Sequence, residues 1–192
     1  PIGPACHLVR FLERDGRMYA LKELPVRVAG HEYDILRAMA GRSLPAVIAV
    51  GISESSERGT GILVTEYLAH SLQYRRLLMR LPAGPGAYRD RLLDAMASLL
   101  VDLHLGGVYW GDCSLANTLF RRSGDKIQAY LVDAETSEVH ERLSNGQRAA
   151  DLEVLVENVA FGLADLALMQ GRREEIDDAV EAAQSVRRRY EA

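Results

Sequence analysis

Two polar side chains, Asp112 and Asn117, lie five positions apart between two apolar segments. A carboxylate and an amide buried without partners would cost several kcal/mol of desolvation, so this spacing predicts a loop whose side chains point into a polar cleft. A second apolar run, residues 129–132, leads directly to Asp133. Three oxygen-bearing side chains would converge there. The alternative interpretation is an Asx-rich turn between two strands.

The elements around these side chains can be predicted from periodicity and turn signals. Residues 91–105 carry apolar side chains at helical spacing and are followed by two glycines, Gly106 and Gly107, just before the loop. Residues 118–122 and 127–133 flank a turn at 123–125, which predicts a hairpin that aims Asp133 at the cleft. Further helices are expected from about residue 71, over 147–168 and over 174–190, with a loop at 81–86 and a structural role for His104.

The first third of the chain predicts a small sheet and one helix. Strands are expected at residues 7–13 and 18–24, joined by an Asp15-Gly16 turn with positive φ angles, and at 46–52 and 61–68, with a loop at 53–60. A helix is expected at 31–39. Lys22 shares one strand face with apolar neighbours. Such a lysine can also be an edge-strand charge that discourages aggregation.

Composition restricts the classes of function. The 192 residues suit one domain or two small lobes. Cys6 and Cys113 are the only cysteines, so a disulfide framework and a four-cysteine metal site are excluded. A formal net charge of −4 argues against a protein that mainly coats nucleic acid. No apolar run approaches the ~20 residues that span a bilayer, and signal-peptide features are missing from the first residues, so a cytoplasmic location is expected.

Several motifs occur in the order typical of the protein-kinase-like fold. Residues 109–120 read YWGDCSLANTLF and contain an Asp-x-x-x-x-Asn loop, and residues 131–136 read LVDAET. Residues 19–22 read YALK, which is similar to the kinase strand with the ATP-binding lysine. The chain therefore resembles a bacterial family of protein-kinase-like proteins related to lipopolysaccharide-type sugar kinases and to RIO-type minimal kinases.

The resemblance implies an α+β, two-lobed fold and a role for each motif residue. A small antiparallel N-lobe with one helix is expected over residues 1–67 and a shortened, mainly helical C-lobe over 68–192, with a cleft between them. Asp112 would accept the proton of the attacking hydroxyl. Asn117 and Asp133 would hold Mg²⁺ on the nucleotide phosphates.

The remaining roles concern the nucleotide. Lys22 would bind the α and β phosphates of ATP, and Ala20 would pack on the adenine. Glu32 would hold Lys22 through an ion pair, with the ten-residue connection closing through Pro25 and a turn at Gly30. Glu23 is the poorer candidate for this ion pair, because its side chain points to the opposite face of the strand from Lys22. Glu66 and Leu68 would present backbone groups to the adenine, as a kinase hinge does.

The chain also departs from conventional kinases. A Gly-rich phosphate lid is missing unless Gly3 is its remnant, and Trp110-Gly111 precedes Asp112 where protein kinases have His-Arg. Glu135 follows as a possible extra metal ligand. Asp151 comes eighteen residues after Asp133, which leaves little room for a segment that docks peptides. Asp151 matches the aspartate that anchors the catalytic-loop backbone in kinase-like folds. Alternatively, its negative charge near the start of a helix could simply interact favourably with the helix dipole.

The expected function is an ATP- and Mg²⁺-dependent phosphotransferase that moves the γ-phosphate to a hydroxyl. The acceptor could be a carbohydrate, a small molecule or one dedicated protein. The alternative is a pseudokinase, a nucleotide-binding or scaffold module that acts through a protein partner. Lys22, Asp112, Asn117 and Asp133 favour the enzyme, whereas the missing lid favours the scaffold.

Overall fold

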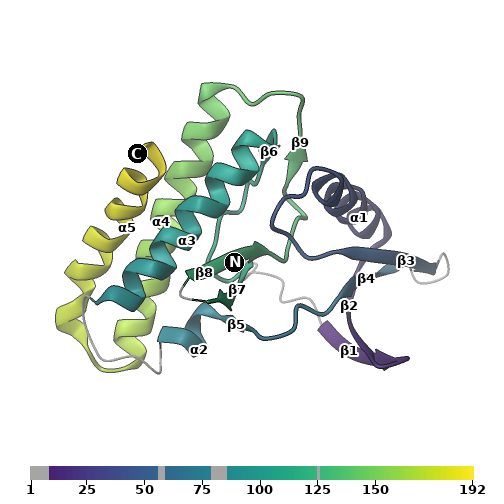
Figure 1. The fold of residues 1–192 in the computed structure, drawn as a ribbon, viewed down its shortest axis with the longest axis horizontal. Coiled ribbons are helices and arrows are strands. Elements are labelled where there is room, and N and C mark those ends of the chain that lie inside the picture. The colour runs from purple at the N-terminus through teal and green to yellow at the C-terminus, as the bar shows by residue number, and fades with distance from the viewer. Residues whose placement is uncertain (1–8, 56–58, 79–85, 125) are drawn as a thin grey trace. The chain divides into compact units, whose positions relative to one another are not determined.

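A computed structural model describes residues 9–55, 59–78, 86–124 and 126–192. The chain divides into two compact units, Pro1–Ala69 and His70–Ala192. Figure 1 shows antiparallel strands early in the chain and most of the helices later, which confirms the predicted α+β class. Within the described residues, no helix combines the length and the apolar character that crossing a membrane requires.

The first unit contains a four-stranded antiparallel sheet. Its strands are β1 (Val9–Arg14), β2 (Arg17–Pro25), β3 (Ala49–Ser55) and β4 (Thr60–Glu66), in the order β1-β2-β4-β3. The β1–β2 turn has positive φ angles at Asp15 (53°) and Gly16 (72°), as predicted. This turn fixes the register, because the tight two-residue connection matches the right-handed twist of the strands.

Helix α1 (Val26–Gly41) packs on β2, β3 and β4. It begins directly after Pro25, so the predicted start at residue 31 and the predicted turn at Gly30 are wrong. A proline fits just before a helix because its missing N–H is not needed there, and packing of the buried α1 residues outweighs the low helix propensity of Gly30. β3 also runs to Ser55, where a loop was expected from residue 53.

The second unit is mainly helical. Its helices are α2 (Tyr74–Leu78), α3 (Ala87–Leu105), α4 (Asn145–Met169) and α5 (Ile176–Glu191), with a 3₁₀ turn at Arg173–Glu175 before the last. α5 packs on both α3 and α4. The start of α4 is fixed by a capping box, in which Ser144 Oγ accepts from Gln147 N and the Gln147 side chain accepts from Ser144 N.

Two small sheets complete this unit. One contains β5 (Ser71–Gln73), β7 (Thr118–Ser123) and β8 (Lys126–Leu131), and the other pairs β6 (Val108–Tyr109) with β9 (Glu138–Val139). The predicted β7–β8 hairpin is confirmed. The prediction of a helix from residue 71 is wrong for residues 71–73, because these residues pair with β7 as a strand. Helix α2 begins at Tyr74. The expectations for Gly3, Cys6 and residue 7, and most of the 81–86 loop, lie outside the described residues.

Candidate active site

The loop from Asp112 to Asn117 closes on itself through hydrogen bonds. Asn117 Nδ2 donates to Asp112 Oδ2 over 2.9 Å, and the Asn117 backbone N–H donates to Ser114 Oγ over 3.2 Å. Ser114 N–H in turn donates to the backbone oxygen of Asp112 over 2.9 Å. The predicted pair is therefore brought together, with the amide nitrogen of Asn117 turned to the carboxylate. The amide oxygen is the ligand atom that Asn117 can offer to a cation.

Asp151 binds the backbone at the start of this loop from the protein interior. This α4 carboxylate is fully buried, and it accepts backbone N–H groups of Trp110 at 2.7 Å and Gly111 at 2.8 Å. A third contact comes from His104 Nε2, 3.0 Å from Asp151 Oδ2. Three polar partners compensate for burial of the charge. Asp151 is thus an anchor for the loop backbone, and not an exposed charge at the start of a helix.

His104 is a structural histidine, as predicted. Its ring is 1% exposed, and its second nitrogen, Nδ1, lies 2.7 Å from the hydroxyl of Tyr190. The His104 side chain therefore connects α3, α4 and α5 beneath the loop. Both ring nitrogens contact groups of the protein interior, which is the environment of a structural histidine.

Gly111 allows the loop to pass close to the segment after Asp133. Its φ angle is +83°, and a Cβ atom at this position would lie 2.8 Å from the backbone oxygen of Thr136. Next to it, the Trp110 backbone oxygen accepts from the hydroxyls of Thr136 at 3.0 Å and Ser137 at 3.1 Å. The glycine between Trp110 and Asp112 is thus required by conformation and by space.

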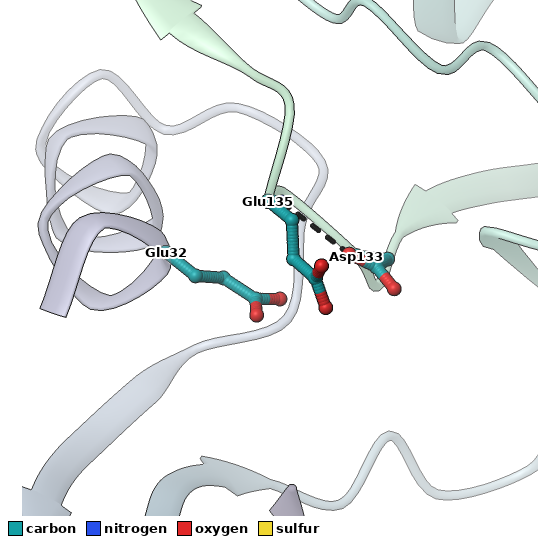
Figure 2. A group of neighbouring side chains, drawn as sticks. All are labelled: Glu32, Asp133 and Glu135. Carbon is teal, nitrogen blue, oxygen red and sulfur yellow. Dashed lines mark hydrogen bonds between the residues drawn. The ribbon is translucent and has the colours of Figure 1, made fainter. Parts of the chain in front are cut away.

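The β7–β8 hairpin positions Asp133 relative to the loop. Thr118 pairs with Leu131 in the hairpin. Val132 N–H donates to the backbone oxygen of Asn117 over 3.1 Å. Asp133 is the next residue after Val132 and therefore lies close to Asn117 along the paired backbones. Figure 2 shows Asp133 and Glu135 on the segment after β8, with Glu135 N–H donating to Asp133 Oδ1 over 3.3 Å. This turn orients the Asp133 carboxylate. Glu135 remains a candidate ligand.

In the first unit, Lys22 and Glu32 form a buried ion pair. Lys22 Nζ lies 3.1 Å from Glu32 Oε2, and the two side chains are 13% and 0% exposed. Glu32 projects from α1 (Figure 2), and Lys22 lies on β2 beside buried Leu24. The pairing agrees with the predicted partner, and the helix that begins at Val26 brings Glu32 within reach despite the short connection.

The other residues assigned to the nucleotide also lie in this unit. Ala20 is directly opposite Thr65 of β4, two residues before Lys22 on the same strand face. Glu66 ends β4, and Tyr67 N–H donates to the backbone oxygen of Met18 over 3.0 Å, so the strand pairing continues to the predicted hinge. Leu68 follows just beyond it. The roles of Ala20, Glu66 and Leu68 stay predictions.

Cys113 lies next to Asp112 but is not a nucleophile. Its side chain is fully buried, and burial, followed by the negative charge of Asp151, raises the pKa of the thiol well above its ordinary value. Asn158 Nδ2 donates to the Cys113 backbone oxygen over 3.2 Å. The neutral thiol therefore packs under the loop, while the exposed Asp112 carboxylate points away from the core.

Sequence reasoning missed three supports of the loop: Thr136, Ser137 and Tyr190. The hydroxyls at 136 and 137 follow Asp133 directly, but nothing in their spacing indicates that they bind Trp110. Tyr190 lies near the end of the chain, and only the crossing of α3 and α5 brings it to His104. A tyrosine in an otherwise charged helical run was the available signal.

Comparisons with known proteins identify a family and a similar fold. The model of the lipopolysaccharide kinase (Kdo/WaaP) family matches residues 8–175. A similar solved structure, described as WaaP in complex with acyl carrier protein, is 21% identical with a TM-score of 0.61, and the match covers 100% of this chain and 86% of that chain. At this identity the likeness concerns the fold, and it confirms the predicted protein-kinase-like class. No curated protein gave a significant match.

Proposed function

Because the chain belongs to the lipopolysaccharide kinase (Kdo/WaaP) family and is thus a kinase-type phosphotransferase, we propose that it moves the γ-phosphate of Mg-ATP to a hydroxyl group of a carbohydrate. The observation that carries the proposal is the loop in which Asn117 donates to Asp112 while buried Asp151 holds the backbone before it. An exposed carboxylate on a fixed backbone suits the positioning of an acceptor hydroxyl.

Asp112 is the proposed catalytic base. Its carboxylate would accept the proton of the sugar hydroxyl as the hydroxyl oxygen attacks the γ-phosphorus. The bond between the γ-phosphorus and the β,γ-bridging oxygen breaks in the same step, and ADP leaves. The hydrogen bond from Asn117 fixes one carboxylate oxygen, Oδ2, so that the other, Oδ1, can face the acceptor.

Asn117 and Asp133 are the proposed Mg²⁺ ligands. Their oxygen atoms fit the ion, because Mg²⁺ usually takes one or two carboxylates together with phosphate oxygens and water. The orientation of both side chains supports this role: the Asn117 nitrogen is turned to Asp112, and the Glu135 N–H fixes one Asp133 oxygen. When bound, Mg²⁺ would neutralise the charge that develops on the phosphates.

Lys22 is the proposed contact to the α and β phosphates. Its ammonium group is oriented by Glu32, 3.1 Å away, and a lysine held in this way acts as a fixed point charge for phosphate. Ala20, Glu66 and Leu68 complete the proposed nucleotide contacts, with the small Ala20 side chain against the base.

A carbohydrate acceptor suits the short segment between Asp133 and Asp151. This segment pairs with β6 through β9 and then enters the capping box of α4. A segment committed to these contacts leaves little chain for docking a peptide substrate. The family and this segment together support a sugar hydroxyl as the acceptor.

Turnover of ATP tests the proposal. The purified chain should convert Mg-ATP to ADP and phosphorylate a carbohydrate pool that contains lipopolysaccharide-type sugars, detected by mass increase of the sugar, and omission of Mg²⁺ should abolish transfer. Binding of Mg-ATP without transfer or hydrolysis above background would favour a scaffold instead. The same preparation should be tested for binding of acyl carrier protein, because the similar WaaP structure is a complex with that partner.

A further inference from the structure

An exposed aromatic residue lies on the face of the sheet that carries Lys22. Phe11 on β1 is directly opposite Ala20 on β2, which is directly opposite Thr65 on β4. Residues directly opposite in antiparallel strands project from the same face, so these three side chains form one row. Lys22 follows two residues after Ala20 and shares this face.

The Phe11 ring has a defined orientation although it is 59% exposed. It makes an edge-to-face contact with Tyr67, with ring centroids 5.6 Å apart and an interplanar angle of 88°. Tyr67 is itself held to the sheet by its backbone hydrogen bond to Met18. Such a pair fixes the position of an aromatic ring that would otherwise be mobile.

The neighbours of Phe11 in its row are small. Ala20 and Thr65 follow across the sheet, so a large aromatic side chain is beside two short ones. The row therefore places one large aromatic side chain beside two small side chains, which leaves space above Ala20 and Thr65. The ammonium group of Lys22 lies on the same face of the sheet. A planar, apolar group joined to an anion is the chemistry that fits, and a purine nucleotide has that form.

We propose that Phe11 stacks on the adenine base of the nucleotide and is a binding residue of this chain. The inference rests on the proposed function, since it takes ATP as the ligand. Stacking of a base on an aromatic ring is worth ~1–3 kcal/mol, which corresponds to about a five- to 150-fold change in affinity. Phe11 thus supplies affinity for the base, whereas Lys22 supplies affinity for the phosphates.

Calorimetric titration of the whole chain with Mg-ATP tests this role. Phe11→Ala should weaken ATP binding by about five- to 150-fold and Phe11→Leu nearly as much, whereas Phe11→Trp should keep the affinity, because only Trp retains an aromatic ring. Phe161→Ala is the matched control, because Phe161 is 72% exposed on α4 and should leave affinity unchanged. The affinity for tripolyphosphate, which has no base, should not change in any variant.

The outcomes separate this inference from the proposed function. Wild-type protein that binds no Mg-ATP would overturn the proposed function itself. Wild-type binding with unchanged affinity in Phe11→Ala, or with equal losses in Phe11→Trp and Phe11→Ala, would overturn only the stacking role. An equal loss of affinity for tripolyphosphate and ATP would also overturn it. Thermal unfolding of each variant identifies any change that is due to folding.

Discussion

Asn117 donates a hydrogen bond through Nδ2 to Asp112 Oδ2, over 2.9 Å. This single contact assigns an orientation to both side chains, because an amide that donates to a carboxylate must turn its oxygen elsewhere. The carboxylate in turn keeps its second oxygen for another partner. The proposed proton acceptor and the proposed metal ligand thus share one hydrogen bond, and substitution can separate the two proposed roles.

Asp112→Asn should separate binding from chemistry. The new amide oxygen can still accept from Asn117, so the loop should keep its shape, but the side chain can no longer accept a proton from the acceptor. Transfer should fall by roughly 10²–10⁴-fold while the calorimetric affinity for Mg-ATP stays within about twofold. Asp165→Asn, an exposed aspartate on α4, is the control that should keep full activity. Equal loss of affinity and turnover in Asp112→Asn would contradict the role as base.

Asp133→Ala should remove the Mg²⁺ dependence of ATP binding. If Asp133 is a ligand of the nucleotide-bound ion, calorimetry should give similar, weak ATP affinities for this variant with and without Mg²⁺, whereas wild type should bind more tightly with Mg²⁺. Asp177→Ala, an exposed aspartate on α5, should behave as wild type. Unchanged Mg²⁺-dependent affinity in Asp133→Ala would exclude it as a ligand.

The sequence was most informative where chemistry and periodicity coincide. The hairpin before Asp133 was predicted from its turn signal, and the pairing of Lys22 with Glu32 was predicted from the resemblance to kinases. The structural role of His104 was predicted as well, although its partners, Asp151 and Tyr190, were not predicted. Contacts between helices distant in sequence leave no local pattern.

The errors share a physical cause, since local propensity was outweighed by tertiary contacts. Gly30 reads as a breaker, yet it is inside α1 because the helix buries an apolar side that includes Leu36 and Met39. Residues 71–73 read as a helix start, yet they are a strand because β7 offers backbone partners. The site residues were instead assigned from motifs and their order along the chain, so an error in a helix or strand boundary does not change which residues were assigned.

The Lys22–Glu32 pair predicts a strong coupling in the free energy of unfolding. Lys22→Met would remove the cationic partner of a fully buried carboxylate, which should destabilise the protein by about 3–5 kcal/mol. Glu32→Leu should cost a similar amount, but the double variant should cost much less than the sum, because no buried charge is then left without its partner. Chemical denaturation of the four proteins checks the cycle. Additive costs would show that the two side chains do not interact.

Replacement by alanine should have opposite effects on stability at two glycines, Gly111 and Gly30. Gly111→Ala should destabilise the protein by at least about 2 kcal/mol and reduce transfer, because the residue has a φ of +83° and the new Cβ would press on the Thr136 backbone. Gly30→Ala should stabilise by about 0.5–1 kcal/mol, because it lies inside α1 with nothing within 4 Å of the added atom. Thermal unfolding measures both. A neutral Gly111→Ala would contradict the close contact beside Asp112.

The Cys113 thiol predicts a pH dependence of stability at alkaline pH. Burial and the Asp151 charge raise its pKa in the folded state above the ordinary value of about 8.5, so above that pH the folded chain holds a proton that the unfolded chain releases. The corresponding stability is fully present below pH ~8.5 and is lost progressively as the pH rises toward the folded pKa. Cys113→Ala should lack this loss, so the stability difference from the parent should shrink between pH 8 and pH 10.

Alkylation measures the same property directly. In a Cys6→Ser background, Cys113 is the only thiol of the chain, and at pH 9 iodoacetamide should modify it at least about 100-fold more slowly in the native protein than in denaturing urea. The reagent needs a thiolate that it can reach, and the folded site provides neither access nor ionisation. Mg-ATP should not accelerate the reaction, because the Cys113 thiol is buried in the core and not on the exposed side of the loop. Rapid native modification at pH 9 would mean that the backbone around Asp112 opens readily, which would conflict with its anchoring by Asp151.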